Sequence, residues 1–169
     1  AVAVAILLAL VGVFINFRVN YKNYYDPFID FEFRLDFGAY GRSGINTFNN
    51  TITKDLVLEG NVVTGFSLTE RQRMIIYNKM VDMDIMSYSS DLNYGVYDFI
   101  HPENLALNVR IGAEDKTIYW STPWDFSKED IDKLSEEQTE FLELVNYIRR
   151  IVYKSKEYRN LPKHSGGYL

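Results

Sequence analysis

The chain has no cysteine among its 169 residues and only two histidines, His101 and His164. The absence of cysteine excludes disulfides, thiolate metal sites, iron–sulfur clusters, thiol nucleophiles and lipid attachment through a cysteine. Two histidines that are far apart in the sequence also provide little for a histidine-rich metal site or a Ser/His/Asp triad. We therefore expect no metal, no cofactor and no catalytic residues.

Basic residues are outnumbered, with 18 Lys and Arg against 23 Asp and Glu. The net charge is −5, and residues 1–25 contribute +2 through Arg18 and Lys22, so residues 26–169 carry −7. Binding to nucleic-acid phosphates needs clustered Lys and Arg, and we therefore expect no nucleic-acid partner. With 47% hydrophobic and 24% charged residues the composition is that of a globular protein, and the length fits one domain behind a short terminal segment.

Residues 1–15 are all apolar or glycine, and the first charged residue is Arg18. This run favours an uncleaved signal anchor, a transmembrane helix over residues 1–17, although a spanning helix needs about 20 apolar residues. A cleaved signal peptide is the main alternative, but the run does not end in the small residues that cleavage needs. A buried core helix is the third possibility.

We expect residues 18–27 to link this anchor to a single extracytoplasmic domain over residues 28–169. The two basic residues on the visible flank favour a cytoplasmic domain. However, a single N-terminal anchor usually exports the domain that follows it, and we give this general tendency more weight than the two basic residues. The expected location is therefore the cell membrane, in a single-pass protein whose domain faces outside.

Alternation of apolar and polar residues predicts several strands. Residues 29–37 alternate strictly between apolar and charged side chains, which is typical of a strand with one buried face. A second extended region covers residues 45–58, and a turn precedes residues 62–66, so this part holds two or three strands. Residues 105–111 alternate again, turn over residues 112–116, and continue in a return strand with Ile118 and Trp120.

Two capping boxes predict helices. Thr69 with Gln72 begins a helix that runs to about residue 83, and Ser135 with Gln138 begins a longer one with an apolar stripe along one side. Hairpins without a strand–helix–strand rhythm favour an antiparallel sheet. The expected fold class is α+β, with about four or five antiparallel strands, two helices on one face of the sheet, and the transmembrane helix in front.

The segment from residue 46 to residue 55 is the strongest candidate for a binding surface, together with the neighbouring loop 38–50. It is predicted to be extended and is rich in side chains that form hydrogen bonds, so it can bind a partner strand or a polar ligand. A solvated sheet face with cross-strand threonines is the simpler alternative. The candidate binding residues are Asn46, Thr47, Asn49, Thr51, Lys54 and Asp55.

Several short motifs resemble a known group of proteins. They are Asn46-Thr47-Phe48, Thr51-x-Thr53-Lys54-Asp55, Ser67-Leu68-Thr69-Glu70, Met83-Asp84-Ile85, and Leu161-Pro162 followed by Gly166-Gly167-Tyr168. Over about residues 28–169 the chain resembles small uncharacterised lipoproteins and membrane-anchored proteins of Gram-positive bacteria. The resemblance implies a place outside the cytoplasm and no known activity. Members of that group often carry a lipobox cysteine, which this chain lacks.

These observations favour a membrane-tethered binding domain without enzymatic activity. Its expected partners are the membrane, through residues 1–17, and an unidentified protein or cell-envelope polymer. The layout is also similar to small proteinaceous inhibitors of extracellular proteases, which gives an alternative by analogy of fold alone. The last alternative is a hydrolase that uses carboxylates such as Asp55, Asp98 or Glu103 with His101.

Overall fold

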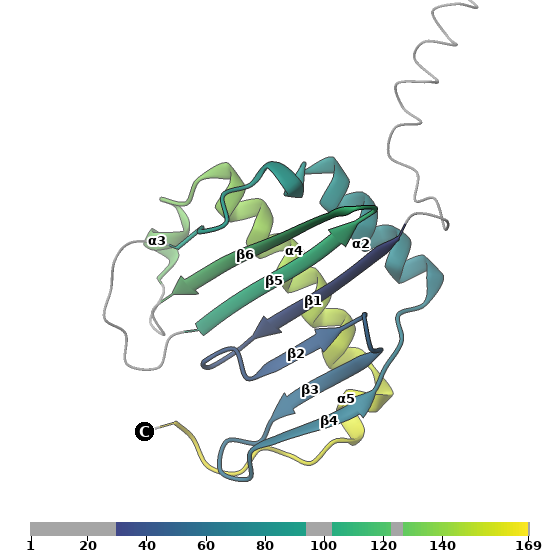
Figure 1. Ribbon diagram of the computed structural model, residues 1–169. Coiled ribbons are helices and arrows are strands. Elements are labelled where there is room, and N and C mark those ends of the chain that lie inside the picture. The colour runs from purple at the N-terminus through teal and green to yellow at the C-terminus, as the bar shows by residue number, and fades with distance from the viewer. Residues whose placement is uncertain (1–29, 94–102, 123–126, 169) are drawn as a thin grey trace, which may run out of the picture.

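The computed structural model describes residues 30–93, 103–122 and 127–168 (Figure 1). They form one six-stranded antiparallel sheet with helices on one face, in the strand order β4-β3-β2-β1-β5-β6. The strands are β1 (Phe31–Phe37), β2 (Ser43–Asn46), β3 (Thr51–Asp55), β4 (Asn61–Gly65), β5 (Glu103–Ile111) and β6 (Glu114–Thr122). The helices are α2 (Glu70–Asp82), α3 (Lys128–Ile131), α4 (Glu136–Lys154) and α5 (Lys156–Asn160), with a 3₁₀ turn η2 (Ile85–Ser87).

The predicted anchor (1–17) and linker (18–27) lie outside the described residues. Within the described ranges, no helix combines the length and the apolar character needed to cross a membrane.

The α+β class and the antiparallel sheet are confirmed, but the expected number of four or five strands is wrong. The predicted extended region 45–58 contains a turn over residues 47–50 that separates β2 from β3. In this turn Asn50 has a φ of 53°. Asparagine tolerates this left-handed conformation better than most residues, so Asn49-Asn50 was the turn signal in the sequence.

The strictly alternating strand β1 lies in the interior of the sheet. It pairs with β2 on one side and β5 on the other. Its apolar residues are buried on the helix side, and its charged residues Glu32, Arg34 and Asp36 lie on the opposite face. The predicted hairpin is confirmed as β5–β6, although its turn is shorter than expected and β6 begins at Glu114.

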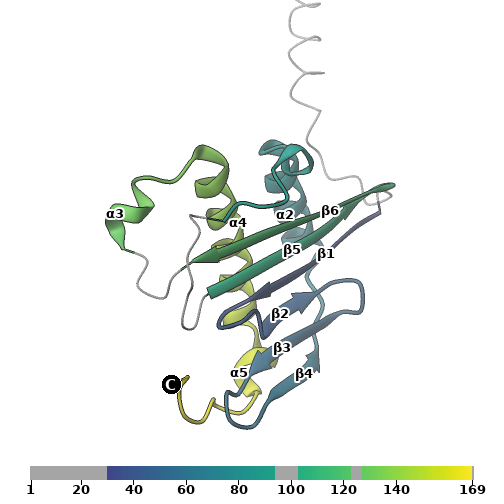
Figure 2. The same cartoon turned by 60° about the vertical axis from the view of Figure 1, so that its left-hand side comes forward.

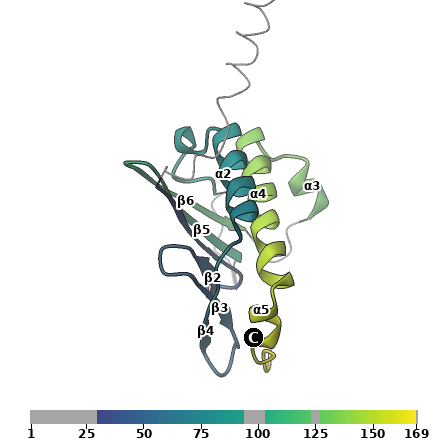
Figure 3. The same ribbon diagram turned by 90° about the vertical axis from the view of Figure 1, so that its right-hand side faces the viewer.

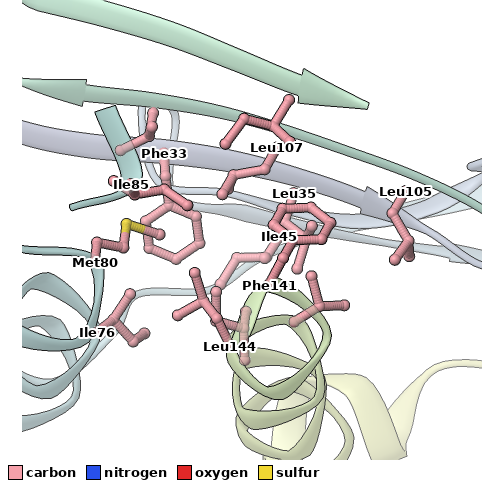
Figure 4. Close-up of a cluster of buried hydrophobic side chains, with 14 of the residues drawn as sticks. Phe33, Leu35, Ile45, Ile76, Met80, Ile85, Leu105, Leu107, Phe141 and Leu144 are labelled. Atoms are coloured by element: carbon pink, nitrogen blue, oxygen red, sulfur yellow. The ribbon is translucent and has the colours of Figure 1, made fainter. Parts of the chain in front are cut away.

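Both predicted capping boxes are present. Thr69 N–H donates to Gln72 Oε1 at 2.9 Å and Gln72 N–H donates to Thr69 Oγ1 at 3.3 Å, and Ser135 and Gln138 make the same pair of bonds at the start of α4. α2 and α4 cover the same face of the sheet (Figure 3). Figure 4 shows their side chains meeting those of the strands, and the core includes Phe33, Leu35, Leu107, Ile76, Met80, Phe141 and Leu144.

The other face of the sheet carries no helix of the described part of the chain, as Figures 2 and 3 show. A six-stranded sheet covered on one side only leaves a broad polar face open to solvent. This face is where the candidate site lies.

Candidate functional site

The open face of the sheet is hollowed over four neighbouring strands, β2, β1, β5 and β6. The depression is shallow and has a volume of about 540 Å³. Its lining comes from side chains that alternate with the core residues of the same strands. The strand alternation that forms the core therefore also places the site residues on the opposite face.

One row of polar side chains crosses the depression from strand to strand. The register places Asn46 opposite Arg34, Arg34 opposite Asn108, and Asn108 opposite Thr117. Asn108 Nδ2 donates to Thr117 Oγ1 at 3.0 Å, and Arg34 Nε donates to Asp36 Oδ1 at 3.0 Å. The row therefore presents amide, guanidinium and hydroxyl groups side by side, which suits a ligand that forms many hydrogen bonds.

The next row contains two small residues, Gly44 and Ala106, on either side of Asp36. The register aligns Gly44 with Asp36 and Asp36 with Ala106, and Ala106 with Tyr119. A Cβ atom on Gly44 would lie 2.8 Å from Leu35 O and 2.9 Å from Asp36 Oδ1. The Asp36 carboxylate thus rests against Gly44. Because Gly44 and Ala106 have little or no side chain, the surface is low at this row.

Two exposed aromatic rings, Phe48 and Tyr119, contribute to the lining of the depression. Phe48 belongs to the β2–β3 turn and is 39% exposed, and Tyr119 lies on β6 and is 55% exposed. Arg110 lies over the Phe48 ring at 5.2 Å from its centre and also pairs with Asp115 at 3.0 Å. Aromatic faces and planar polar groups together bind ligands by stacking and by hydrogen bonds.

The six candidate residues predicted from the sequence do not share this surface. Asn46 lines the depression, and its Oδ1 accepts a hydrogen bond from Phe48 N–H at 3.0 Å. Thr47 is buried and bonded to Phe33. Asn49 and Thr51 bond to each other across the turn at 2.6 Å. The bonds of Asn46, Thr47, Asn49 and Thr51 fix the conformation of the turn.

Lys54 and Asp55 contact the C-terminal segment of the same chain. Lys54 lies above the Tyr158 ring of α5, with Nζ 5.0 Å from the ring centre, and donates to Leu161 O at 3.5 Å. Asp55 accepts a hydrogen bond from the Tyr168 hydroxyl and another from Val57 N–H at 2.9 Å. Both Lys54 and Asp55 therefore form contacts within the chain, to its C-terminal segment.

The Asp55–Tyr168 contact belongs to a small cluster at the loop between β1 and β2. Arg42 lies over the rings of Tyr40 and Tyr168, at 5.5 Å and 5.6 Å from their centres, and its Nη1 donates to the Tyr168 hydroxyl at 3.4 Å. Burial, the hydrogen bond to Asp55 and the charge of that carboxylate raise the pKa of Tyr168. These contacts hold the C-terminal segment against the loop 38–42.

Of the carboxylates considered for a hydrolase, Asp55 and Glu103 are described. Glu103 Oε1 accepts a hydrogen bond from Arg149 Nη1 at 2.6 Å. Burial lowers the pKa of Arg149, but the charges of Glu103 and Tyr153 and the hydrogen bonds to both residues together outweigh it, so the net shift is upward. Asp98 and His101 lie outside the described residues. In the described part of the chain no three His, Asp or Glu side chains are grouped to hold a metal ion.

Most residues of the depression were not predicted from the sequence. Arg34, Asp36, Asn108 and Arg110 were recognisable as outward-facing residues of predicted strands, but no local signal places β5 beside β1. A comparison with protein-family models and with curated proteins found no match to this chain. The hydrolase and protease-inhibitor hypotheses therefore stay predictions, and the geometry of the open face is the main guide to function.

Proposed function

We propose that this protein is a non-enzymatic binding domain that holds its ligand on the open face of the sheet. The observation that carries the proposal is the depression of about 540 Å³ between β2 and β6, with a row of hydrogen-bonding side chains and two exposed aromatic rings. The ligand is a protein segment or a cell-envelope polymer, since both offer dense hydrogen-bonding groups to a shallow surface.

The proposed setting is the outer side of the cell membrane, with residues 1–17 as the anchor. Support comes from the apolar sequence of this segment and from the resemblance to membrane-anchored proteins of Gram-positive bacteria. A domain held there meets envelope polymers and secreted proteins at high local concentration. Tethering therefore compensates for the modest affinity that a shallow site provides.

Binding can be tested with two variants of the depression and one control on the same face. Asn108→Ala removes a central hydrogen-bonding group, and Tyr119→Ala removes an exposed ring. Thr53→Ala changes the open face on β3, outside the depression. The full chain in detergent is sedimented with purified peptidoglycan, and a photoreactive residue at position 119 records protein partners in intact cells.

We expect Tyr119→Ala and Asn108→Ala each to weaken the captured interaction by about tenfold, which corresponds to about 1.4 kcal/mol. Thr53→Ala should bind as the unmodified chain does. If Asn108→Ala and Tyr119→Ala bind as tightly as Thr53→Ala and the unmodified chain do, the depression is excluded as the binding site.

The location can be tested through the turn between β5 and β6. Ala113 is exposed there, and the chain has no native cysteine. In an Ala113→Cys variant, a maleimide that cannot cross membranes would label intact cells if the domain faces outside. Labelling that appears only after lysis would place the domain in the cytoplasm and contradict the proposed setting.

A further inference from the structure

The edge strand β4 has an outer side that forms no main-chain hydrogen bonds with the described part of the chain. β4 pairs with β3 alone, and directly after it Phe66 N–H donates to Asn50 O at 2.8 Å. Main-chain groups of an antiparallel strand point alternately toward and away from the neighbouring strand. Those of Asn61, Val63 and Gly65 therefore point away from β3. Within the described ranges, no group forms a hydrogen bond with the main chain of these three residues.

β4 also lacks the features that commonly protect an edge strand. It contains neither a proline nor a charged residue, and its central Val63 is 58% exposed. The opposite edge of the sheet is different. There Leu92 N–H donates to Tyr119 O and Tyr119 N–H donates to Ser90 O, both at 2.9 Å, so the chain itself lies along β6. Among the residues that the structure describes, β4 is therefore the edge left open to an added strand.

The surface next to this open edge is basic. α5 contacts β4 and lies on the helix-covered side of β3 and β4 (Figures 1 and 3). Lys154, Lys156 and Arg159 are exposed, and none of them takes part in an ion pair within the described part of the chain. Residues 154–163 hold four basic residues against one acid, Glu157, although the whole chain has a net charge of −5.

We propose that the edge of β4 binds an extended segment of a partner protein that carries acidic side chains at alternate positions. The main-chain groups of Asn61, Val63 and Gly65 pair with this segment, which extends the sheet by one strand. Because side chains alternate along a strand, the acidic ones face the basic surface of α5 and the others contact Val63.

This site is distinct from the depression, which lies over β2, β1, β5 and β6. A second copy of the chain fits the edge less well than an acidic segment does. Pairing β4 with its own copy would bring two basic α5 helices together, and like charges at close range oppose association.

The probe is a capped peptide of the sequence Val-Glu-Val-Glu-Val-Glu-Val, titrated into the full chain in detergent micelles and followed by calorimetry. We expect saturable binding that weakens as salt is added. The same peptide with Lys in place of Glu should bind at least about tenfold more weakly. N-methylation of the peptide groups that face β4 should abolish binding, because it removes the donors of the added strand.

Variants of the protein test the same contacts from the other side. Val63→Pro removes an outward N–H at an edge position that accommodates proline, and we expect binding to weaken at least about tenfold. Val63→Thr keeps the N–H and should bind normally. Lys156→Glu and Arg159→Glu should weaken binding, whereas Lys116→Glu makes the same charge change on β6 and should not.

The proposal is overturned if the glutamate peptide does not bind saturably, if the lysine peptide binds equally well, or if Val63→Pro binds like the unmodified chain. A concentration-dependent dimer of the protein alone that Val63→Pro abolishes would make a second copy the occupant and would also overturn it. Tyr119→Ala, which changes the depression, should bind the peptide normally. The proposal for the edge of β4 and the function proposed for the depression can therefore fail independently of each other.

Discussion

Replacing Thr47 by valine tests whether this residue stabilises the sheet. Thr47 is only 5% exposed. Its hydroxyl oxygen accepts a hydrogen bond from Phe33 N–H at 2.7 Å and its hydroxyl proton is donated to Phe33 O at 3.0 Å. The carbonyl of Thr47 accepts a bond from Asn50 N–H at 3.4 Å in the following turn. The hydroxyl therefore takes the place of the carbonyl in the ladder between β1 and β2.

The expected loss of stability follows from the role of the Thr47 hydroxyl as the acceptor for Phe33 N–H. Valine has nearly the shape of threonine but no hydroxyl, so Thr47→Val leaves the buried Phe33 N–H without an acceptor. An unsatisfied buried donor costs about 1–3 kcal/mol of the free energy of unfolding. For a chain of this length such a change lowers the Tm by roughly 2–12 °C. Thr47→Ser keeps the hydroxyl and loses one methyl group, which contributes about 0.8 kcal/mol.

Urea unfolding of the unmodified chain and of both variants measures the free energies, and hydrogen exchange measures the Phe33 amide directly. We expect Thr47→Val to be the least stable and to exchange this amide fastest, while Thr47→Ser keeps the amide protected. A valine variant as stable as the unmodified chain, with a protected Phe33 amide, would refute the reasoning. If the prediction holds, a loss of binding in Thr47 variants reports on the fold and does not identify a ligand contact.

Three further predictions concern stability. Gly44→Ala should lower the free energy of unfolding in urea by about 1–3 kcal/mol, because the added Cβ would lie 2.8 Å from the Leu35 carbonyl oxygen. The control Gly65→Ala should lower it by less than about 1 kcal/mol, because a Cβ there meets nothing within 4 Å. Glu103→Gln should lower the free energy of unfolding by about 1–2 kcal/mol in the same assay, because Arg149 loses the charged partner of a half-buried pair. Burial raises the pKa of Tyr158 from 10.0 to about 12. The protonated hydroxyl therefore contributes stability that is fully present below pH 10 and is lost as the pH rises toward 12. In unfolding measurements over that range, Tyr158→Phe should therefore lose less stability than the unmodified chain, and an equal loss would contradict the assignment.

Local patterns in the sequence determined most of the secondary structure. The strict alternation in β1 predicted which residues are buried, and the two capping boxes predicted the starts of α2 and α4 at Thr69 and Ser135. These signals are readable because they depend on neighbours within a few residues along the chain. The turn at Asn49-Asn50 was also local, but its signal is weak beside the long polar run, and the number of strands was therefore underestimated.

The candidate site was decided by the tertiary structure. Asn46 and Thr117 belong to one row of the depression although 71 positions separate them in the sequence. Alternation tells which face of a strand a residue occupies, but it does not tell which strand lies beside it. The same is true of the open edge. The sequence of β4 shows no charge and no proline, but only the strand order leaves it unpaired, because pairing between distant strands depends on the packing of the whole chain.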